Sequence, residues 1–98
     1  MKATLLWRAR IVYSETAFAE LVLWQTPQSV KGSAHLYKYR LAYVVDGICV
    51  LRYDNEAGKG DHRHVDDEEM AYPFSTPEQL IADFQADIAR WHDDNGYS

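Results

Sequence analysis

The chain has 98 residues, 47% hydrophobic and 13% aromatic, which suits one globular domain over residues 1–98 and excludes a disordered chain. Its single cysteine, Cys49, excludes an internal disulfide and a multi-cysteine zinc site. A net charge of −5 argues against binding to nucleic acid through bulk charge alone. The charge is uneven, however: residues 1–53 hold seven Lys/Arg and three Asp/Glu, whereas residues 54–98 hold three and twelve. We therefore expect a basic surface on the first half.

The beginning of the chain predicts an antiparallel hairpin. Residues 3–13 (ATLLWRARIVY) and 17–25 (AFAELVLWQ) are rich in β-formers and are joined by the polar SET. Neither face of the second run is fully polar, so we expect a sheet that is covered on much of both sides. No apolar run reaches membrane-spanning length, and the basic start lacks a signal-peptide cleavage pattern. The sequence thus predicts a cytoplasmic protein without membrane contact.

A second hairpin gives the clearest structural signal. Residues 36–45 (LYKYRLAYVV) and 48–55 (ICVLRYDN) flank Asp46-Gly47, which favours a type I′ turn. A regular ladder from that turn would place Tyr43 opposite Val50 and Arg40 opposite Tyr53. Polar residues then gather at the end away from the turn, where the next loop also leaves the sheet.

The remainder predicts one short strand and one helix. DHRHV (61–65) can re-enter the sheet, VDDEEM (65–70) is typical of a solvated acidic connector, and AYPF (71–74) of an extended segment. Thr76-Pro77 is a helix start, and apolar residues recur at helical spacing to about residue 93, with Asp83, Asp87 and Arg90 off their stripe. We therefore predict an α+β fold: an antiparallel β-sheet of about four to six strands built from hairpins and packed by one C-terminal amphipathic helix.

The stretch YDNEAGKGDHRH (53–64) carries the candidate chemistry. In an extended segment His62 and His64 point the same way, and two imidazoles can serve as general acid and base near neutral pH. Metal-independent cleavage of RNA needs such a pair and cations that hold the charge of the phosphorane. Candidates for the second task are Arg40, Arg52, Arg63 and Lys59, while Tyr39 or Tyr53 could stack on a base or donate a proton.

Other interpretations of the same stretch stay open. Gly58-Lys59-Gly60 can form an anion-binding nest or a plain hairpin turn. Asp61, His62 and His64, with Asp54, are reasonable ligands for a divalent transition ion, although nearby cations oppose it. A purely structural polar cluster is the third alternative. His35 and His92 are expected to be surface histidines.

Two strings, KYRLAYVVDGICVLRYDNEAGKGDHRH (38–64) and YPFSTPEQLIADF (72–84), resemble the TumE-type toxins of toxin–antitoxin modules. The resemblance covers most of the chain. It implies a toxin that is encoded beside a helix-turn-helix antitoxin and acts on RNA or translation. It also marks Tyr53-Asp54-Asn55 and Gly58 to His64 as the candidate site.

The favoured hypothesis is a toxin that works as a metal-independent endoribonuclease without a cofactor. The alternatives are a non-enzymatic module that binds RNA, the ribosome or the antitoxin, and a metal-dependent nuclease. Exposed strand edges would also permit a homodimer. The expected catalytic residues are His62, His64, Arg63, Lys59 and Tyr53. The expected substrate-binding residues are Arg40, Arg52, Lys38, Tyr39, Asp54, Asn55, Gly58, Gly60 and Asp61.

Overall fold

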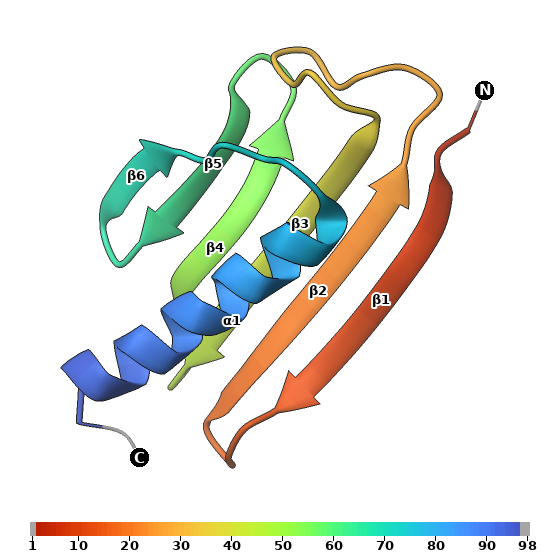
Figure 1. The fold of residues 1–98 in the computed structure, drawn as a ribbon. Helices are drawn as coiled ribbons and strands as arrows, with labels where there is room; N and C mark the ends of the chain where they lie inside the picture. Colours follow the sequence, from red (N-terminus) through yellow and green to blue (C-terminus); the bar gives the residue numbers. More distant parts are fainter. Residues whose placement is uncertain (1, 97–98) are drawn as a thin grey trace.

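The computed structural model describes residues 2–96 as one antiparallel sheet and one helix (Figure 1). The elements are β1 (Thr4–Val12), β2 (Ala17–Gln25), β3 (Tyr37–Val45), β4 (Ile48–Glu56), β5 (Gly60–Val65), β6 (Glu68–Ala71) and α1 (Pro77–Asp94). The strands lie in the order β1-β2-β3-β4-β5-β6, so each pairs with its neighbours in sequence. The predicted α+β class and the C-terminal helix are confirmed.

Short turns join all neighbouring strands except β2 and β3, which are joined by the loop over residues 26–36. Asp46 and Gly47 both adopt positive φ, 52° and 77°, as the type I′ turn between β3 and β4 requires. The predicted strand at DHRHV forms β5, but the expectation of a connector over residues 65–70 is wrong for its second half. Glu68–Ala71 is β6 and pairs with His62–Val65. Acidic side chains suit an exposed edge strand because they discourage pairing with further chains.

The predicted register between β3 and β4 is wrong beyond the first two pairs. Val45 faces Ile48 and Val44 faces Cys49, but a shift then places Tyr43 opposite Leu51 and Arg40 opposite Asp54. Val50 is the additional residue on β4, which is the pattern of a β-bulge. Because side chains alternate between the faces, this one residue moves every later side chain of β4 to the other face relative to β3.

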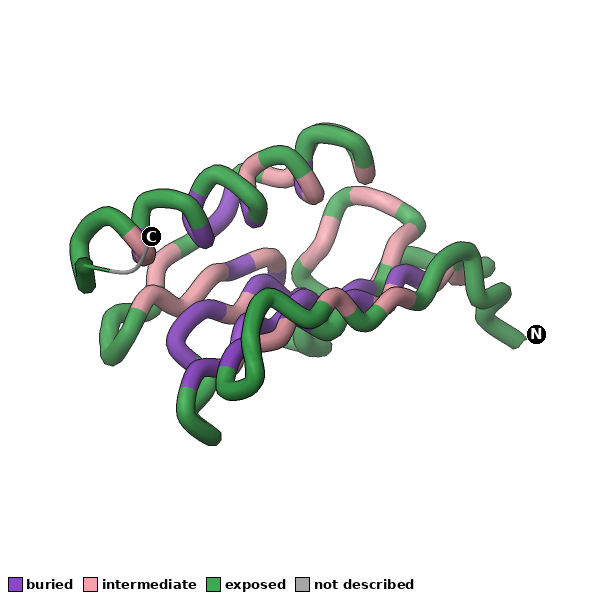
Figure 2. Tube along the Cα trace, turned by 90° about the horizontal axis from the view of Figure 1, so that it is seen from below, coloured by how far each residue is buried: buried purple, intermediate pink, exposed green. Residues whose placement is uncertain are grey.

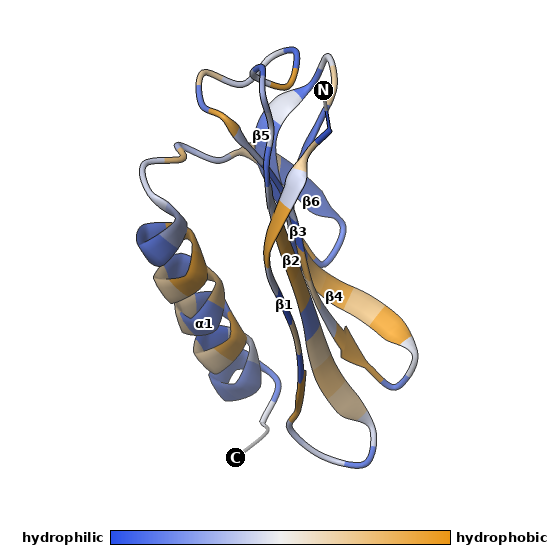
Figure 3. Cartoon of the chain, turned by 90° about the vertical axis from the view of Figure 1, so that its right-hand side faces the viewer, coloured by the Kyte–Doolittle hydropathy of each residue, from blue (hydrophilic) through white to orange (hydrophobic). Residues whose placement is uncertain are grey.

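Helix α1 covers only one face of the sheet (Figure 3), so the expected cover on both faces is wrong. Thr76 accepts the Gln79 amide N–H at 3.1 Å, which confirms the predicted helix cap. Figure 2 shows buried parts of the central strands facing buried parts of α1. We call the uncovered side the open face. Within residues 2–96 no helix is long and apolar enough to cross a membrane.

The core fills the space between α1 and the sheet. Many of its members come from alternating positions of β2, β3 and β4 and from the helix stripe: Leu21, Leu41, Tyr43, Leu51, Tyr53, Leu80, Phe84, Ile88 and Trp91. Tyr53 and Phe84 meet edge to face, with ring centroids 5.6 Å apart. Asp87, which the periodicity places off the stripe, is also buried here. The packing of α1 therefore includes a carboxylate that needs polar partners.

Candidate active site on the open face

Two rows of residues cross all six strands on the open face. Residues that pair across antiparallel strands point to the same side, so each row follows directly from the register. The first row consists of Arg8, Val22, Arg40, Asp54, His62 and Ala71. The second consists of Arg10, Glu20, Ala42, Arg52, His64 and Glu69. The two rows bring arginines of the first hairpin into line with the histidines of β5.

The rows converge on a group of five side chains that we call the histidine cluster: Asp54, His62, His64, Arg52 and Glu69. His62 Nε2 lies 2.7 Å from Asp54 Oδ1, and Arg52 Nε lies 3.2 Å from Asp54 Oδ2. Arg52 Nη2 lies 2.9 Å from His64 Nε2, which is also 3.4 Å from Glu69 Oε2. His62 is only 4% exposed, whereas the His64 side chain is 24% exposed. His64 is therefore the histidine that a bound molecule can reach.

The protonation of His62 is constrained by its backbone partner. Its Nδ1 lies 3.1 Å from the Gly60 carbonyl oxygen, which can only accept a hydrogen bond, so Nδ1 carries the proton. In the neutral ring Nε2 then presents a lone pair to the Asp54 carboxylate. Both facing atoms, His62 Nε2 and Asp54 Oδ1, are buried, and neither has an aligned hydrogen-bond partner among residues 2–96. Such a pair requires a proton or a cation between its atoms.

Two adjoining hollows lie on the open face, and the second reaches the cluster at Arg52 and Asp54. One of about 340 Å³ is lined by Arg8, Arg10, Glu20, Val22 and Arg40, among others. The next, of about 330 Å³, shares Val22 and Arg40 and continues over Trp24, Lys38, Arg52 and Asp54. Guanidinium groups bind phosphate oxygens in pairs, and an indole ring provides a stacking surface for a base. The lining thus suits an extended anionic chain that leads toward His64.

The comparisons with known proteins give one match. The model of the family described as "Toxin TumE" matches residues 2–92. The chain belongs to the TumE toxin family. Neither the curated proteins nor the solved structures include a match. Membership makes the chain a toxin of a toxin–antitoxin system, for which an antitoxin partner is expected in general.

Tyr53 and Arg63 lie on the helix side of the sheet, away from the two histidines. Tyr53 donates its hydroxyl to Asp87 Oδ2, and Arg63 Nη1 lies 3.0 Å from the same oxygen. Burial and then the bond to Asp87 raise the pKa of the Tyr53 hydroxyl above its ordinary value. A hydrogen bond to Tyr53 raises the pKa of the Arg63 guanidinium. These two residues fasten α1 to the sheet, and sequence spacing alone gave no sign of Asp87 as their partner.

The glycine-rich turn between β4 and β5 contacts the backbone of the loop over residues 26–36. Gly58 N–H donates to the Lys31 carbonyl at 2.7 Å, and Lys59 N–H donates to the Glu56 carbonyl at 3.1 Å. These amides are therefore not available to an anion in the way a nest requires. Gly60 lies against Gly32, whose carbonyl oxygen would be 2.7 Å from a Cβ added at residue 60. Lys59 itself is exposed at the tip of the turn.

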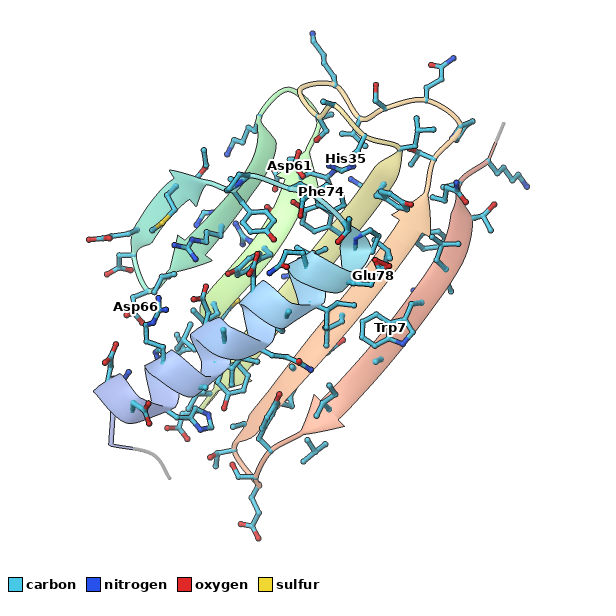
Figure 4. All side chains as sticks on the ribbon, in the orientation of Figure 1. Trp7, His35, Asp61, Asp66, Phe74 and Glu78 are labelled. Atoms are coloured by element: carbon cyan, nitrogen blue, oxygen red, sulfur yellow. The ribbon has the colours of Figure 1, made fainter. Side chains whose placement is uncertain are left out.

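Asp61, expected at the site, instead anchors the loop over residues 26–36 on the helix side. It accepts hydrogen bonds from Ser33 Oγ and Tyr39 Oη, both at 2.6 Å, and lies 2.7 Å from His35 Nε2. The His35 ring stacks on Phe74 at 3.8 Å between centroids (Figure 4). His35 is therefore half-buried, and not the surface histidine that the sequence predicts. Burial and then the bond to Asp61 raise the pKa of Tyr39.

Asn55 and His92 both make hydrogen bonds within the fold. Asn55 Oδ1 accepts the Tyr39 N–H at 2.9 Å and its amide donates to the Tyr37 carbonyl at 2.7 Å, so it extends the β3–β4 pairing. His92, expected at the surface, is partly buried and hydrogen-bonds the Tyr43 hydroxyl. Of the residues expected to act on a substrate, the structure thus brings together on the open face His62, His64, Arg40, Arg52, Lys38 and Asp54. It adds Arg8 and Arg10, whose alternation with apolar neighbours was visible in the sequence, and Glu69, which the sequence analysis placed in an acidic connector.

Proposed function

We propose that this TumE-family toxin is an endoribonuclease that binds RNA along the open face and cleaves it beside His64. One observation carries the proposal: Asp54 and Arg52, which contact His62 and His64, line the second of two adjoining hollows that are lined by arginines. Phosphate binding needs the arginines, and cleavage needs a proton carrier at their end. The family supports the toxin role, and the site supports the choice of RNA as target.

The reaction would form a bond between the ribose 2′-oxygen and phosphorus and break the bond from phosphorus to the 5′-oxygen. A base removes the 2′-hydroxyl proton, and an acid returns a proton to the leaving oxygen. Arg40 and Arg52 would hold the charge that develops on the other phosphate oxygens. His64 is the exposed histidine of the cluster and would act next to the reacting phosphate, as a proton carrier or, in the metal-dependent form, as a ligand of the ion.

The second histidine raises a difficulty for the metal-independent scheme. His62 is 4% exposed and its Nε2 faces Asp54, so the ring cannot reach a ribose or a leaving oxygen in this arrangement. We assign His62 and Asp54 as positioning residues behind His64. The arrangement thus favours a metal-dependent form of the reaction over the form that the sequence alone favoured.

The antitoxin belongs to the same proposal. We propose a helix-turn-helix antitoxin, because the acidic second half of the chain complements the basic surface of a DNA-binding partner. Cytoplasmic location and a homodimer stay predictions. A non-enzymatic binding module, the alternative, would not need His64 for toxicity. Growth experiments with a His64 variant therefore separate the two functions.

The test compares wild type, His64→Gln and the control His92→Gln, each expressed in bacteria with growth and total RNA recorded. We expect arrest and new RNA fragments from wild type and the control, and neither from His64→Gln. Circular dichroism of the purified proteins checks that all three are folded. Equal arrest by wild type and His64→Gln, with intact RNA in both cultures, would replace the ribonuclease with the binding module.

A further inference from the structure

We propose that Asp54, His62 and His64 bind a divalent first-row transition ion such as Zn²⁺ or Mn²⁺, with Glu69 beside them as a further carboxylate. One ring nitrogen of each histidine and one carboxylate oxygen of Asp54 all lie within 4.8 Å of one another. Bonds of about 2.1 Å to an ion hold ligand atoms no more than about 4.2 Å apart. Binding therefore needs a small rearrangement, in which the most distant ligand atoms move inward and the His62–Asp54 pair moves apart from 2.7 Å.

A buried pair of polar atoms marks where the ion would bind. His62 Nε2 and Asp54 Oδ1 are 2.7 Å apart and buried, and neither has an aligned partner among residues 2–96. The Gly60 carbonyl holds the proton on His62 Nδ1, so the neutral ring has its lone pair on Nε2 and could offer it to an ion. A backbone carbonyl on the far nitrogen is the usual support of a metal-binding histidine. An ion between the two atoms would satisfy both.

The charges of the cluster also suit a cation. Asp54 and Glu69 are two carboxylates, and Arg52 is the single guanidinium that contacts them or the histidines closely. Glu69 Oε1 lies 4.0 Å from His62 Nε2, and Oε2 lies 3.4 Å from His64 Nε2, so Glu69 can reach the same ion. Two histidines with carboxylates favour Zn²⁺, Mn²⁺ or Fe²⁺ over Mg²⁺ and Ca²⁺, which prefer oxygen ligands alone.

Arg52 would compete with the ion for His64 Nε2. Its Nη2 occupies the position beside His64 Nε2 at 2.9 Å, where a metal bond would form. The Arg52 side chain is 31% exposed and can turn outward, while its Nε stays near Asp54 Oδ2. It would then hold the second carboxylate oxygen and leave Oδ1 for the ion. The same movement would carry its guanidinium toward a phosphate bound in the adjoining hollow.

The catalytic use of this ion rests on the proposed ribonuclease function, but its binding does not. A bound transition ion can polarise a phosphate oxygen and can lower the pKa of a water ligand to near neutrality. The water would then serve as the proton acceptor that buried His62 cannot be. This would make His62 and Asp54 ligands and would keep the reaction at the exposed edge of the cluster.

The binding test uses the full chain after treatment with a chelator and removal of the chelator. Zn²⁺ is titrated by calorimetry into wild type, Asp54→Asn, His62→Gln, His64→Gln and the control His92→Gln, with Mg²⁺ as the control ion. We expect saturable binding of a single Zn²⁺ by wild type and His92→Gln, at least tenfold weaker binding by the three cluster variants, and none of Mg²⁺ at the same concentration. Because His64 is partly exposed, His64→Gln should stay folded even if His62→Gln does not.

A second readout is thermal unfolding with and without Zn²⁺. Binding to the folded state alone raises the unfolding midpoint, and we expect that rise in wild type and not in His64→Gln. No saturable binding by wild type, or equal binding by all variants, would overturn the metal site. Zn²⁺ binding without any RNA cleavage would overturn the ribonuclease and leave the metal site. Cleavage of RNA by chelator-treated protein that binds no Zn²⁺ would overturn the metal site and leave the ribonuclease.

Discussion

Gly58 and Gly60 flank Lys59 in the turn between β4 and β5, but only one of them is closely enclosed. Both have positive φ, 89° and 76°, so any other residue is strained at either position. An added Cβ at Gly58 meets nothing within 4 Å, whereas at Gly60 it would lie 2.7 Å from the Gly32 carbonyl oxygen. Gly60 also offers its own carbonyl to His62 Nδ1. This glycine therefore connects the 26–36 loop with the histidine cluster.

The two glycines allow a matched comparison. We expect Gly58→Ala to lower the free energy of unfolding by about 1 kcal/mol, the cost of the left-handed backbone. Gly60→Ala should lower it by about 2–4 kcal/mol, because the loop backbone must also move away. Urea unfolding followed by circular dichroism measures both. Equal losses for the two variants would contradict the close approach of the loop to β5.

At the scale of elements, α1 is attached to the sheet by two tyrosine–aspartate pairs within its apolar contact. Tyr53 on β4 donates to Asp87, and Tyr72, which follows β6, donates to Asp83 Oδ2 at 2.6 Å. Burial is the largest cause that raises the pKa of both hydroxyls, and the aspartate bonds add to it. Both hydroxyls therefore stay protonated in the folded protein where those of an unfolded chain ionise.

This attachment predicts a loss of stability in alkali. Unfolded tyrosines release their protons from about pH 10 upward. Above that pH the folded state binds more protons than the unfolded state, so the free energy of unfolding falls as the pH rises. Below about pH 10 the contribution is complete. Urea unfolding between pH 8 and about pH 11 should show the fall, and the double variant Tyr53→Phe/Tyr72→Phe should show a smaller one. The same slope in both proteins would exclude these hydroxyls as its cause.

At the scale of the whole molecule, five of the seven Lys/Arg of residues 1–53 lie on the open face. The open face carries Arg8, Arg10, Lys38, Arg40 and Arg52, although the protein has a net charge of −5. Arg90 lies on α1, on the other side of the sheet. Under the proposed function, RNA would bind through this face only, and the binding should depend on the salt concentration.

Substitutions at Arg40 and Arg90 test whether RNA binds to the open face. The His64→Gln background prevents cleavage, and fluorescence anisotropy measures the binding of a single-stranded RNA over a range of salt concentrations. We expect Arg40→Gln to weaken binding several-fold and to reduce the slope of log K against log salt by about 0.7, the value for one lost phosphate contact. Arg90→Gln should leave affinity and slope unchanged. Equal weakening by the two substitutions would mean that the open face is not the RNA surface.

The sequence by itself determined the first five strands, α1 and the family, but not β6. Alternating β-formers, Asp46-Gly47 and the cap at Thr76 act through neighbours in the chain, so the hairpins and α1 could be predicted. It also placed His62 and His64 on one side of their strand. These features depend on local backbone preferences, which operate before the chain has folded.

Only the tertiary structure decided which residues face the histidines. The extra residue Val50 changes the β3–β4 register, so Arg40 meets Asp54, and Tyr53 turns toward Asp87 on the helix side. A bulge is set by the packing of the whole sheet against α1, which a periodic pattern does not contain. For the same reason the contact of His35 with Asp61 and the position of Glu69 beside His64 appeared only once distant segments were brought together.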